Sequence, residues 1–177
     1  MSEPRLTVQP FDKALHDRGA FSCGVDAMDR WLRESAAEQI KLNRIRVWCA
    51  SSDERAFVGY YGLAMHSVGP SEMSALARKK ERNPIPMIYL TALAVSTAHQ
   101  GQGIGSALLA DAIARSVALS DEIGVTAILL DVLKDAHFER RRAFYIELGF
   151  AELGNGDPGR LYLSIKDAAA ELAVQLG

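Results

Sequence analysis

Cysteine is scarce in this chain of 177 residues, which contains only Cys23 and Cys49 and no CxxC motif. We therefore expect no disulfide framework, and the composition favours a reduced, cytoplasmic protein. Histidine is scarce as well, and its four occurrences are scattered at His16, His66, His99 and His137. Because these histidines lack the spacing of metal ligands, we expect no metal site.

Long apolar runs and a strong net charge are also missing. No apolar stretch approaches the roughly 18–20 residues that span a bilayer, and residues 1–8 carry no apolar run after their charges. We therefore expect no membrane association and no signal peptide. The formal net charge is −2, so charge alone does not argue for nucleic-acid binding. The length and the mixed composition predict one globular domain over residues 1–177.

The pattern of apolar segments and turns predicts a mixed α/β fold. Expected strands cover residues 5–8, 45–50, 57–65, 87–95, 126–132, 150–153 and 160–165. Expected helices cover residues 25–42, 103–119, 137–148 and 167–176. Apolar runs and helical periodicity support these assignments. A helix separates 87–95 from 126–132, as in a parallel crossover. We expect a central, mostly antiparallel sheet of about six to seven strands flanked by helices.

A glycine-rich loop follows the expected strand at 87–95 and leads into a helix. It consists of Gln100, Gly101, Gln102, Gly103, Ile104, Gly105 and Ser106. Glycine allows a tight turn that brings backbone N–H groups close to a ligand. The start of the helix adds unsatisfied donors and the positive end of its dipole. The loop therefore predicts an anion site suited to a pyrophosphate. A turn that only packs the helix on the sheet is the alternative.

A dinucleotide-binding fold is the main competing interpretation of this loop. Gly101-x-Gly103-x-x-Ser106 is close to the GxGxxG/A fingerprint, and Asp131 ends the next strand, where a ribose-binding acid would lie. However, residues 96–100 separate the strand from the glycines, whereas the dinucleotide turn leaves its strand directly. Only about 45 residues follow Asp131, too few for a second half of such a sheet. No Lys-Ser/Thr pair follows the glycines, which excludes a Walker loop.

The loop resembles the acetyl-CoA signature Q/R-x-x-G-x-G/A of the GCN5-related N-acetyltransferase (GNAT) family. Residues 90–95 (LTALAV) before it and 143–150 (AFYIELGF) after it are also similar to that family, in the same order and spacing. The resemblance covers roughly residues 5–165. It implies the GNAT fold and an enzyme that transfers an acetyl group from acetyl-CoA to a primary amine.

The resemblance also implies roles for single residues. Backbone amides of residues 100–106 would bind the pyrophosphate of acetyl-CoA. The backbone of Leu93, Ala94 and Val95 would pair with the pantetheine arm like an added strand. The N–H group of Val95 would polarise the thioester carbonyl as an oxyanion-type donor.

Two neighbouring aromatic residues complete the implied site. Tyr145 matches the tyrosine that protonates the departing thiolate, and a phenol of ordinary pKa is protonated at neutral pH and can donate. The alternative for Tyr145 is a helix residue whose ring packs on the core with a solvated hydroxyl. Phe144 is expected to anchor the helix in the core and to belong to the cofactor site.

A narrower resemblance concerns the acetyltransferase toxins of bacterial toxin–antitoxin pairs. It is carried by residues 21–32 (FSCGVDAMDRWL), 58–63 (VGYYGL) and 149–163. Those toxins acetylate the α-amine of aminoacyl-tRNA, are inhibited by a ribbon-helix-helix antitoxin and commonly form dimers. The resemblance implies the same acceptor, antitoxin and homodimer here. The open alternatives are an enzyme for small-molecule or protein amines and a CoA-binding module without turnover.

Other residues are candidates for the acceptor side. Asp131 could orient an amine, and either Tyr60 or Tyr61 could line the acceptor cleft. The basic run at residues 140–142 could contact an acceptor stem. For Cys23, a small core or turn residue is favoured over a nucleophile, because no His or Asp partner lies at a recognisable spacing.

Overall fold

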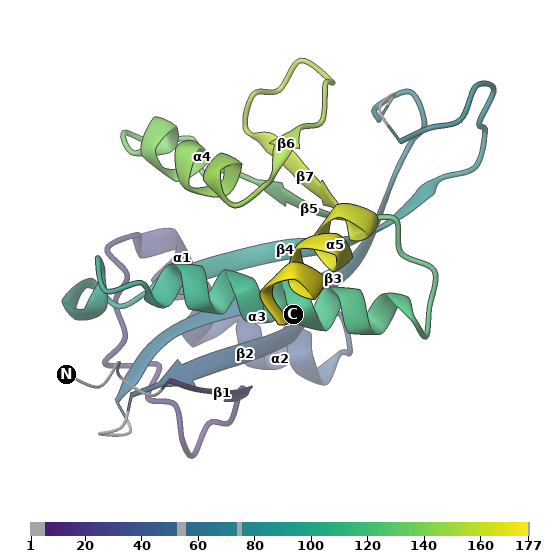
Figure 1. The fold of residues 1–177 in the computed structure, drawn as a ribbon. Coiled ribbons are helices and arrows are strands. Elements are labelled where there is room, and N and C mark those ends of the chain that lie inside the picture. Colours follow the sequence, from purple (N-terminus) through teal and green to yellow (C-terminus); the bar gives the residue numbers. More distant parts are fainter. Residues whose placement is uncertain (1–5, 53–55, 74–75, 177) are drawn as a thin grey trace. The chain divides into compact units, whose positions relative to one another are not determined.

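The computed structural model describes residues 6–52, 56–73 and 76–176. These residues belong to two compact units. Unit 1 comprises Met1–Ala64 and Leu90–Ala112, and unit 2 comprises Met65–Tyr89 and Ile113–Gly177. Figure 1 labels the helices and strands, several of which contribute residues to both units.

In the described residues, seven strands form a sheet with the order β1-β2-β3-β4-β5-β7-β6. The strands are β1 (Thr7–Pro10), β2 (Arg46–Ser51), β3 (Phe57–Val68), β4 (Ile85–Val95), β5 (Ala127–Asp131), β6 (Ala151–Glu152) and β7 (Arg160–Ser164). The β1–β2, β2–β3, β5–β7 and β6–β7 pairs are antiparallel, and the β4–β5 pair is parallel. The expected mixed, mostly antiparallel sheet is therefore confirmed.

The described helices match the predicted ones in order, except that the first is divided and a short 3₁₀ helix precedes α3. They are α1 (Asp26–Glu34), α2 (Ala36–Lys41), the short 3₁₀ helix η1 (Thr97–His99), α3 (Ile104–Ser120), α4 (Phe138–Glu147) and α5 (Ile165–Leu176). The single helix expected over 25–42 is wrong, because Ser35 separates α1 from α2. Its φ of −115° lies outside the α-helical range, and serine is a weak helix former in helix interiors.

Strands β3 and β4 are both longer than predicted. The prolines near residue 85 suggested an irregular segment, yet the carbonyl of Pro86 accepts a hydrogen bond from the N–H of Thr126 at 2.9 Å. A proline lacks only the donor half of a strand pairing, so β4 already begins at Ile85.

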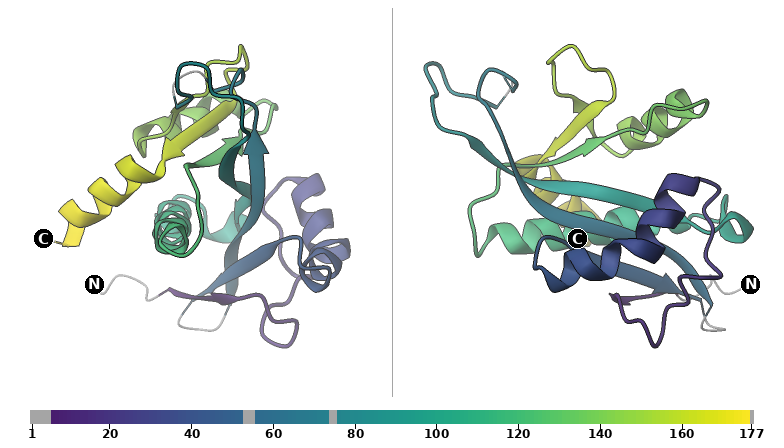
Figure 2. Two further views of the ribbon diagram at one scale, coloured as in Figure 1. Left: turned by 90° about the vertical axis from the view of Figure 1, so that its right-hand side faces the viewer. Right: turned by 180° about the vertical axis from the view of Figure 1, so that it is seen from behind.

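Unit 1 has helices on both faces of its strands. Helices α1 and α2 cover one face, and the first part of α3 covers the other (Figure 2). Tyr60 and its neighbour Tyr61 lie on opposite faces of β3. The Tyr60 hydroxyl donates to the carbonyl of Met28 in α1 at 3.2 Å, whereas the Tyr61 hydroxyl donates to the Asp111 carboxylate in α3 at 2.5 Å. Both tyrosines are fully buried.

The core of unit 1 gathers apolar side chains from the helices and the sheet. Its buried members are Phe21, Cys23, Leu32, Ala36, Ile45, Val47, Cys49, Tyr60 and Ala94. Gly59 lies where β3, β4 and α3 approach one another. A Cβ atom on Gly59 would be 2.8 Å from both the carbonyl oxygen of Ala94 and Cδ1 of Leu108. Any larger residue there would push these elements apart.

Unit 2 packs around the β4–β5–β7 part of the sheet. The parallel β4–β5 pairing runs from Met87 opposite Ala127 to Tyr89 opposite Leu129. The buried core of this unit consists of Val68, Met73, Ile85, Met87, Ala127, Leu129 and Leu153. Helix α5 follows β7 directly, and the hydroxyl of Ser164 accepts the N–H of Asp167 at 3.1 Å at the helix start.

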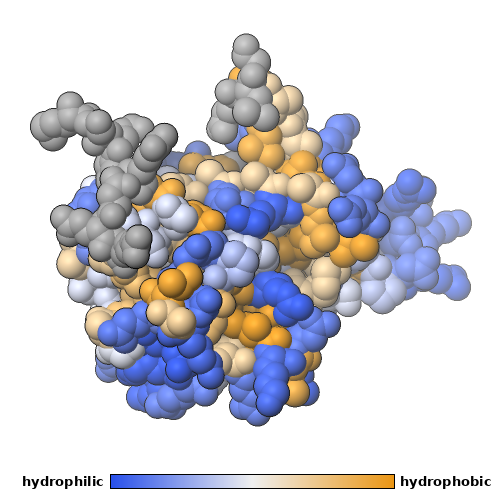
Figure 3. Space-filling model, turned by 90° about the horizontal axis from the view of Figure 1, so that it is seen from below, coloured by the Kyte–Doolittle hydropathy of each residue, from blue (hydrophilic) through white to orange (hydrophobic). Residues whose placement is uncertain are grey.

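None of the helices in the described residues is long and apolar enough to cross a bilayer. In the view of Figure 3, hydrophobic side chains lie in small groups separated by hydrophilic ones. The exposed large apolar residues include Leu15, Met65 and Val174.

Candidate functional site

The glycine-rich loop lies between the end of β4 and the start of α3 in unit 1. Gly101 and Gly103 have φ angles of +77° and +80°. A Cβ atom at either position would meet nothing within 4 Å. Glycine is therefore required here for the left-handed backbone and not for space.

The start of α3 presents free backbone donors. The N–H of Ala107 bonds to the carbonyl of Gly103 at 3.1 Å and begins the helical pattern. The N–H groups of Ile104, Gly105 and Ser106 come before it and have no acceptor within the helix. The first turn of α3 contains no acidic residue, so the positive end of the helix dipole is not neutralised there. This arrangement suits an anion, as predicted for the loop.

The side chain of Gln100 ties the loop to two other segments. Its amide nitrogen Nε2 donates to the carbonyl of Cys23 at 3.0 Å and to the carbonyl of Val95 at 3.0 Å. The end of β4 is thereby connected to the segment that precedes α1. The glycine motif predicts a role only for the backbone of Gln100, and this contact of its side chain has no signal in the sequence.

The same segment is held from the other side by Asp29 of α1. The Asp29 carboxylate accepts the N–H of Cys23 at 2.9 Å and the hydroxyl of Ser22 at 2.8 Å. In addition, the carbonyl of Ser22 accepts the N–H of Thr97 at 2.9 Å. Burial alone would raise the pKa of Asp29, but these hydrogen bonds outweigh it and hold the pKa below its usual value. Although it is a charged residue, Asp29 is only 4% exposed.

Cys23 is a packing residue in this network. It is buried, and its burial raises the pKa of the thiol to about 11, with Asp29 acting in the same direction. A protonated thiol is a poor nucleophile, which agrees with the structural role favoured from sequence.

Close to the loop, the backbone N–H and C=O groups of successive β4 residues point alternately to the two edges of the strand. The N–H of Ser96 donates to the carbonyl of Val58 at 2.8 Å, so the backbone groups of Ser96 face β3. Ala94 faces β3 as well, since its carbonyl oxygen approaches Gly59. By alternation, the backbone groups of Leu93 and Val95 face the other edge of β4. The pairing of β4 with β5 ends at Tyr89, whereas β4 continues to Val95.

Tyr145 lies on α4 in unit 2 and is half-buried. Its ring makes edge contacts with Phe144 at 5.1 Å and with Phe150 at 5.8 Å between centroids. Burial raises the pKa of Tyr145 to about 12, against the opposing effect of Arg141. The phenol is therefore protonated at neutral pH and available as a donor. Phe144 is also only half-buried, and it is Phe150 that is buried in this cluster.

Asp131 has two hydrogen-bonding partners within unit 2. Its carboxylate accepts Nε and Nη2 of Arg160 at 2.9 and 3.1 Å and the hydroxyl of Tyr89 at 2.8 Å. It lies beside a cavity of about 540 Å³ that Lys134 and Asp157 also line. These bonds explain the position of Asp131 without an amine ligand.

The predictions for the acceptor side are revised by burial and by ion pairs. The expectation that Tyr60 or Tyr61 lines an open cleft is wrong, because both are fully buried. In the basic run, Arg141 pairs with Asp135 and Arg142 pairs with Glu152. Only Arg140 of this run has no ion pair within the described part of the chain. Within the described residues, no group of three or more His, Cys, Asp or Glu side chains could hold a metal.

Comparison with known proteins identifies a family and several relatives. The model of the acetyltransferase (GNAT) domain family matches residues 43–152. A protein of Mycobacterium tuberculosis (strain ATCC 25618 / H37Rv), named tRNA-acetylating toxin, is 39% identical over 87% of this chain and 89% of its own length.

Solved structures show the same fold. The structure of AtaT complexed with acetyl-methionyl-tRNAfMet has a TM-score of 0.82 and 25% identity, over 96% of this chain and 99% of that one. The structure of AtaTR bound with AcCoA has a TM-score of 0.78 and 25% identity, over 94% and 98% of the two chains.

Proposed function

The chain belongs to the GNAT family of acetyltransferases, and on this basis we propose that it acetylates the α-amine of aminoacyl-tRNA, as the toxin of a toxin–antitoxin pair. The observation that carries this proposal is the 39% identity to a tRNA-acetylating toxin over 87% of the chain. The tRNA complex of the similar protein AtaT supports the same acceptor.

Unit 1 would bind acetyl-CoA. We assign the pyrophosphate to the amides of residues 100–106, because the two left-handed glycines and the start of α3 present donors there. We assign the pantetheine arm to the outer edge of β4, where the backbone groups of Leu93 and Val95 lie. The carbonyl of Val95 is already used by Gln100, which leaves its N–H as the donor for the thioester carbonyl. The structure of AtaTR with AcCoA supports acetyl-CoA as the donor substrate.

The proposed reaction is a direct transfer. The neutral α-amine attacks the thioester carbon and forms the C–N bond, and the developing oxyanion is stabilised by the N–H of Val95. As the C–S bond breaks, Tyr145 donates its phenolic proton to the thiolate sulfur. After the attack, the nitrogen releases one proton to water. Water returns one proton to the phenolate of Tyr145, so the enzyme ends in its starting form. The aromatic contacts of Tyr145 with Phe144 and Phe150 would restrict its ring to one orientation.

The same comparisons support proposals about partners and location. An antitoxin partner is supported by the structure of a mutant of the AtaT toxin bound to the C-terminus of the antitoxin AtaR, and we keep the ribbon-helix-helix type and a homodimer as parts of the proposal. An enzyme that acts on charged tRNA would work in the cytoplasm. We also propose that residues 1–177 act as a single GNAT domain to which both units contribute.

A direct test is acetyl transfer from labelled acetyl-CoA to charged tRNA, with wild type beside Tyr145→Phe. We expect transfer by the wild type and a loss of at least about tenfold in the variant, with acetyl-CoA binding intact. Transfer to small-molecule or protein amines but not to charged tRNA would replace the proposed acceptor. Binding of acetyl-CoA with no transfer to any amine would instead support a CoA-binding module.

A further inference from the structure

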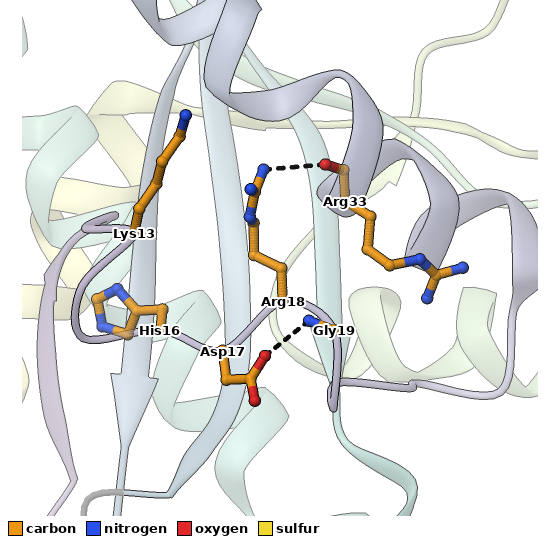
Figure 4. A pocket seen from close by; sticks show the side chains of 6 residues that line it. All are labelled: Lys13, His16, Asp17, Arg18, Gly19 and Arg33. Atoms are coloured by element: carbon orange, nitrogen blue, oxygen red, sulfur yellow. Dashed lines mark hydrogen bonds between the residues drawn. The ribbon is translucent and has the colours of Figure 1, made fainter.

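A pocket in unit 1 lies outside the proposed acetyl-CoA site. It has a volume of about 310 Å³ and is lined by Lys13, His16, Asp17, Arg18, Gly19 and Arg33 (Figure 4). We call it the basic pocket, because three cationic side chains line it with only one carboxylate. Its residues come from the segment between β1 and α1 and from the end of α1.

One oxygen of the carboxylate in the basic pocket is bound by the backbone. Oδ1 of Asp17 accepts the N–H of Gly19 at 2.9 Å and the N–H of Ala20 at 3.3 Å. In Figure 4, Lys13 and Arg18 extend in the same direction, while the Asp17 carboxylate points toward Gly19. Within the described residues, neither Lys13 nor Arg18 forms an ion pair with a carboxylate. Their charges are therefore available to an anionic ligand.

Arg18 is held in place by contacts that leave part of its guanidinium available. Its Nη1 donates to the carbonyl of Arg33 at 2.9 Å, and its Cζ lies 5.7 Å from the centroid of the Phe11 ring. Those contacts leave Nη2 and Nε for a ligand. Because an ordered guanidinium loses little entropy on binding, it suits a tetrahedral oxyanion better than a mobile lysine alone.

The wall behind these cations is rigid and uncharged. His16 is 1% exposed, and its ring lies 6.0 Å from Phe11 and 5.4 Å from Phe57. The Nδ1 atom of His16 accepts the N–H of Asp12 at 2.9 Å. Burial lowers the pKa of His16 despite the opposing influence of Asp12. The positive charge of the pocket therefore comes from Lys13, Arg18 and Arg33, and the buried imidazole of His16 forms part of its wall.

We propose that the basic pocket binds a phosphodiester group of the tRNA backbone through Lys13 and Arg18. This inference rests on the proposed function, since the tRNA partner comes from it. Most of the protein's charge is balanced, with a formal net charge of −2. An acidic protein therefore needs local cationic sites to bind a polyanion, and phosphate contacts of this kind set the register of the RNA on the protein.

The test uses the full chain and fluorescently labelled deacylated tRNA, with binding followed by anisotropy at several salt concentrations. The variants are Lys13→Ala and Arg18→Gln, and Lys166→Ala is the control because it removes an exposed positive charge from α5, outside the pocket. We expect each pocket variant to weaken tRNA binding about three- to tenfold and to reduce the salt slope by about 1. Arg18→Lys should restore part of the loss, because it keeps the charge without the fork.

Other outcomes would overturn the inference. The inference is wrong if the pocket variants bind tRNA with the same affinity and the same salt dependence as wild type and Lys166→Ala. This holds even if the protein acetylates tRNA. A raised KM for acetyl-CoA with unchanged tRNA affinity would assign the phosphate to CoA instead. Binding of a decaglutamate peptide that is lost in Lys13→Ala, with tRNA binding unchanged, would assign the pocket to an acidic protein segment. Conversely, a wild type that binds tRNA through the pocket but acetylates none would contradict the proposed function alone.

Discussion

The side-chain amide of Gln100 donates a hydrogen bond to the carbonyl of Cys23, 77 positions earlier in the chain, at 3.0 Å. The same nitrogen donates to the carbonyl of Val95. One side chain thus connects the glycine-rich loop, the end of β4 and the segment before α1. The precise position of the proposed oxyanion donor at Val95 therefore depends on a residue whose side chain need not contact acetyl-CoA.

Removing this side chain should weaken both the binding of acetyl-CoA and the stability of the fold. In Gln100→Ala, two carbonyl groups lose a donor, and we expect a loss of about 1–2 kcal/mol in the free energy of unfolding. We expect the KM for acetyl-CoA to rise about five- to twentyfold, because Val95 and the loop lose their common anchor. Steady-state kinetics and urea unfolding measure the two effects.

The matched control is Asn83→Ala, which removes an exposed amide side chain in unit 2. It should change the free energy of unfolding by less than about 0.5 kcal/mol. A Gln100→Ala enzyme with the KM of wild type would show that the two hydrogen bonds do not position the loop.

Two glycine-to-alanine substitutions should impair the protein for different physical reasons. Gly101 has a φ of +77° and open space around its Cβ position, so Gly101→Ala should cost about 1–2 kcal/mol through backbone strain. Its main effect should be a loss of acetyl-CoA affinity as the loop changes shape. In Gly59→Ala, the new methyl group would be 2.8 Å from the carbonyl oxygen of Ala94, and we expect about 1–3 kcal/mol of destabilisation from overpacking.

Calorimetric titration with acetyl-CoA and chemical unfolding of both variants separate these effects. We expect the ratio of lost affinity to lost stability to be larger for Gly101→Ala than for Gly59→Ala. If Gly101→Ala binds acetyl-CoA as tightly as wild type, the left-handed backbone at this position is not needed for the anion site.

Much of the fold could be predicted from the sequence because its signals are local. Apolar runs such as residues 126–132 predict the strands, and the turn-forming residues between them predict where each strand ends. The break at Ser35 and the longer β4 could not be predicted in this way. The longer β4 depends on tertiary context, as in the bond from Thr126 to the carbonyl of Pro86. The break was missed because the apolar periodicity of residues 25–42 continues across Ser35.

The candidate site was predictable to the extent that it is a backbone motif. Glycine spacing predicted the loop at 100–106, since left-handed angles require glycine there. The contacts of Gln100 and Asp29 were missed, because the direction of a polar side chain depends on segments distant in the sequence. The basic pocket was missed for the same reason: Lys13, Arg18 and Arg33 are separated in sequence and gather only in the folded chain.

The pH dependence of transfer should report the amine and not Tyr145. An α-amine must lose its proton to attack, so kcat/KM should rise with pH up to about 8 and then level off. The pKa of Tyr145 is raised to about 12, so the phenol remains a donor throughout this range. The profile of wild type, measured between pH 6 and 10, should therefore have no basic limb. Tyr145→Phe should give the same shape at a lower rate. A basic limb below pH 10 that disappears in Tyr145→Phe would contradict a raised pKa for this phenol.

Asp29 should contribute stability that depends on pH. Its folded-state pKa is held below the ordinary value, in spite of burial, by hydrogen bonds that include those from Cys23 and Ser22. A carboxyl group with a lowered pKa stabilises the fold above its unfolded pKa of about 3.9, and this stability is lost as the pH falls through the folded value. Asp29→Asn should therefore lower the free energy of unfolding by about 1.5–3 kcal/mol at pH 7.

The difference between Asp29→Asn and wild type should shrink as the pH is lowered from about 4 toward 2, because the wild-type carboxylate then becomes protonated. Denaturant unfolding at several pH values measures this difference. Asp26→Asn, at an exposed position on the same helix, should cost less than about 1 kcal/mol. A gap between Asp29→Asn and wild type that stays constant from pH 7 to 2 would mean that packing, and not the charge of Asp29, holds the segment that Gln100 contacts.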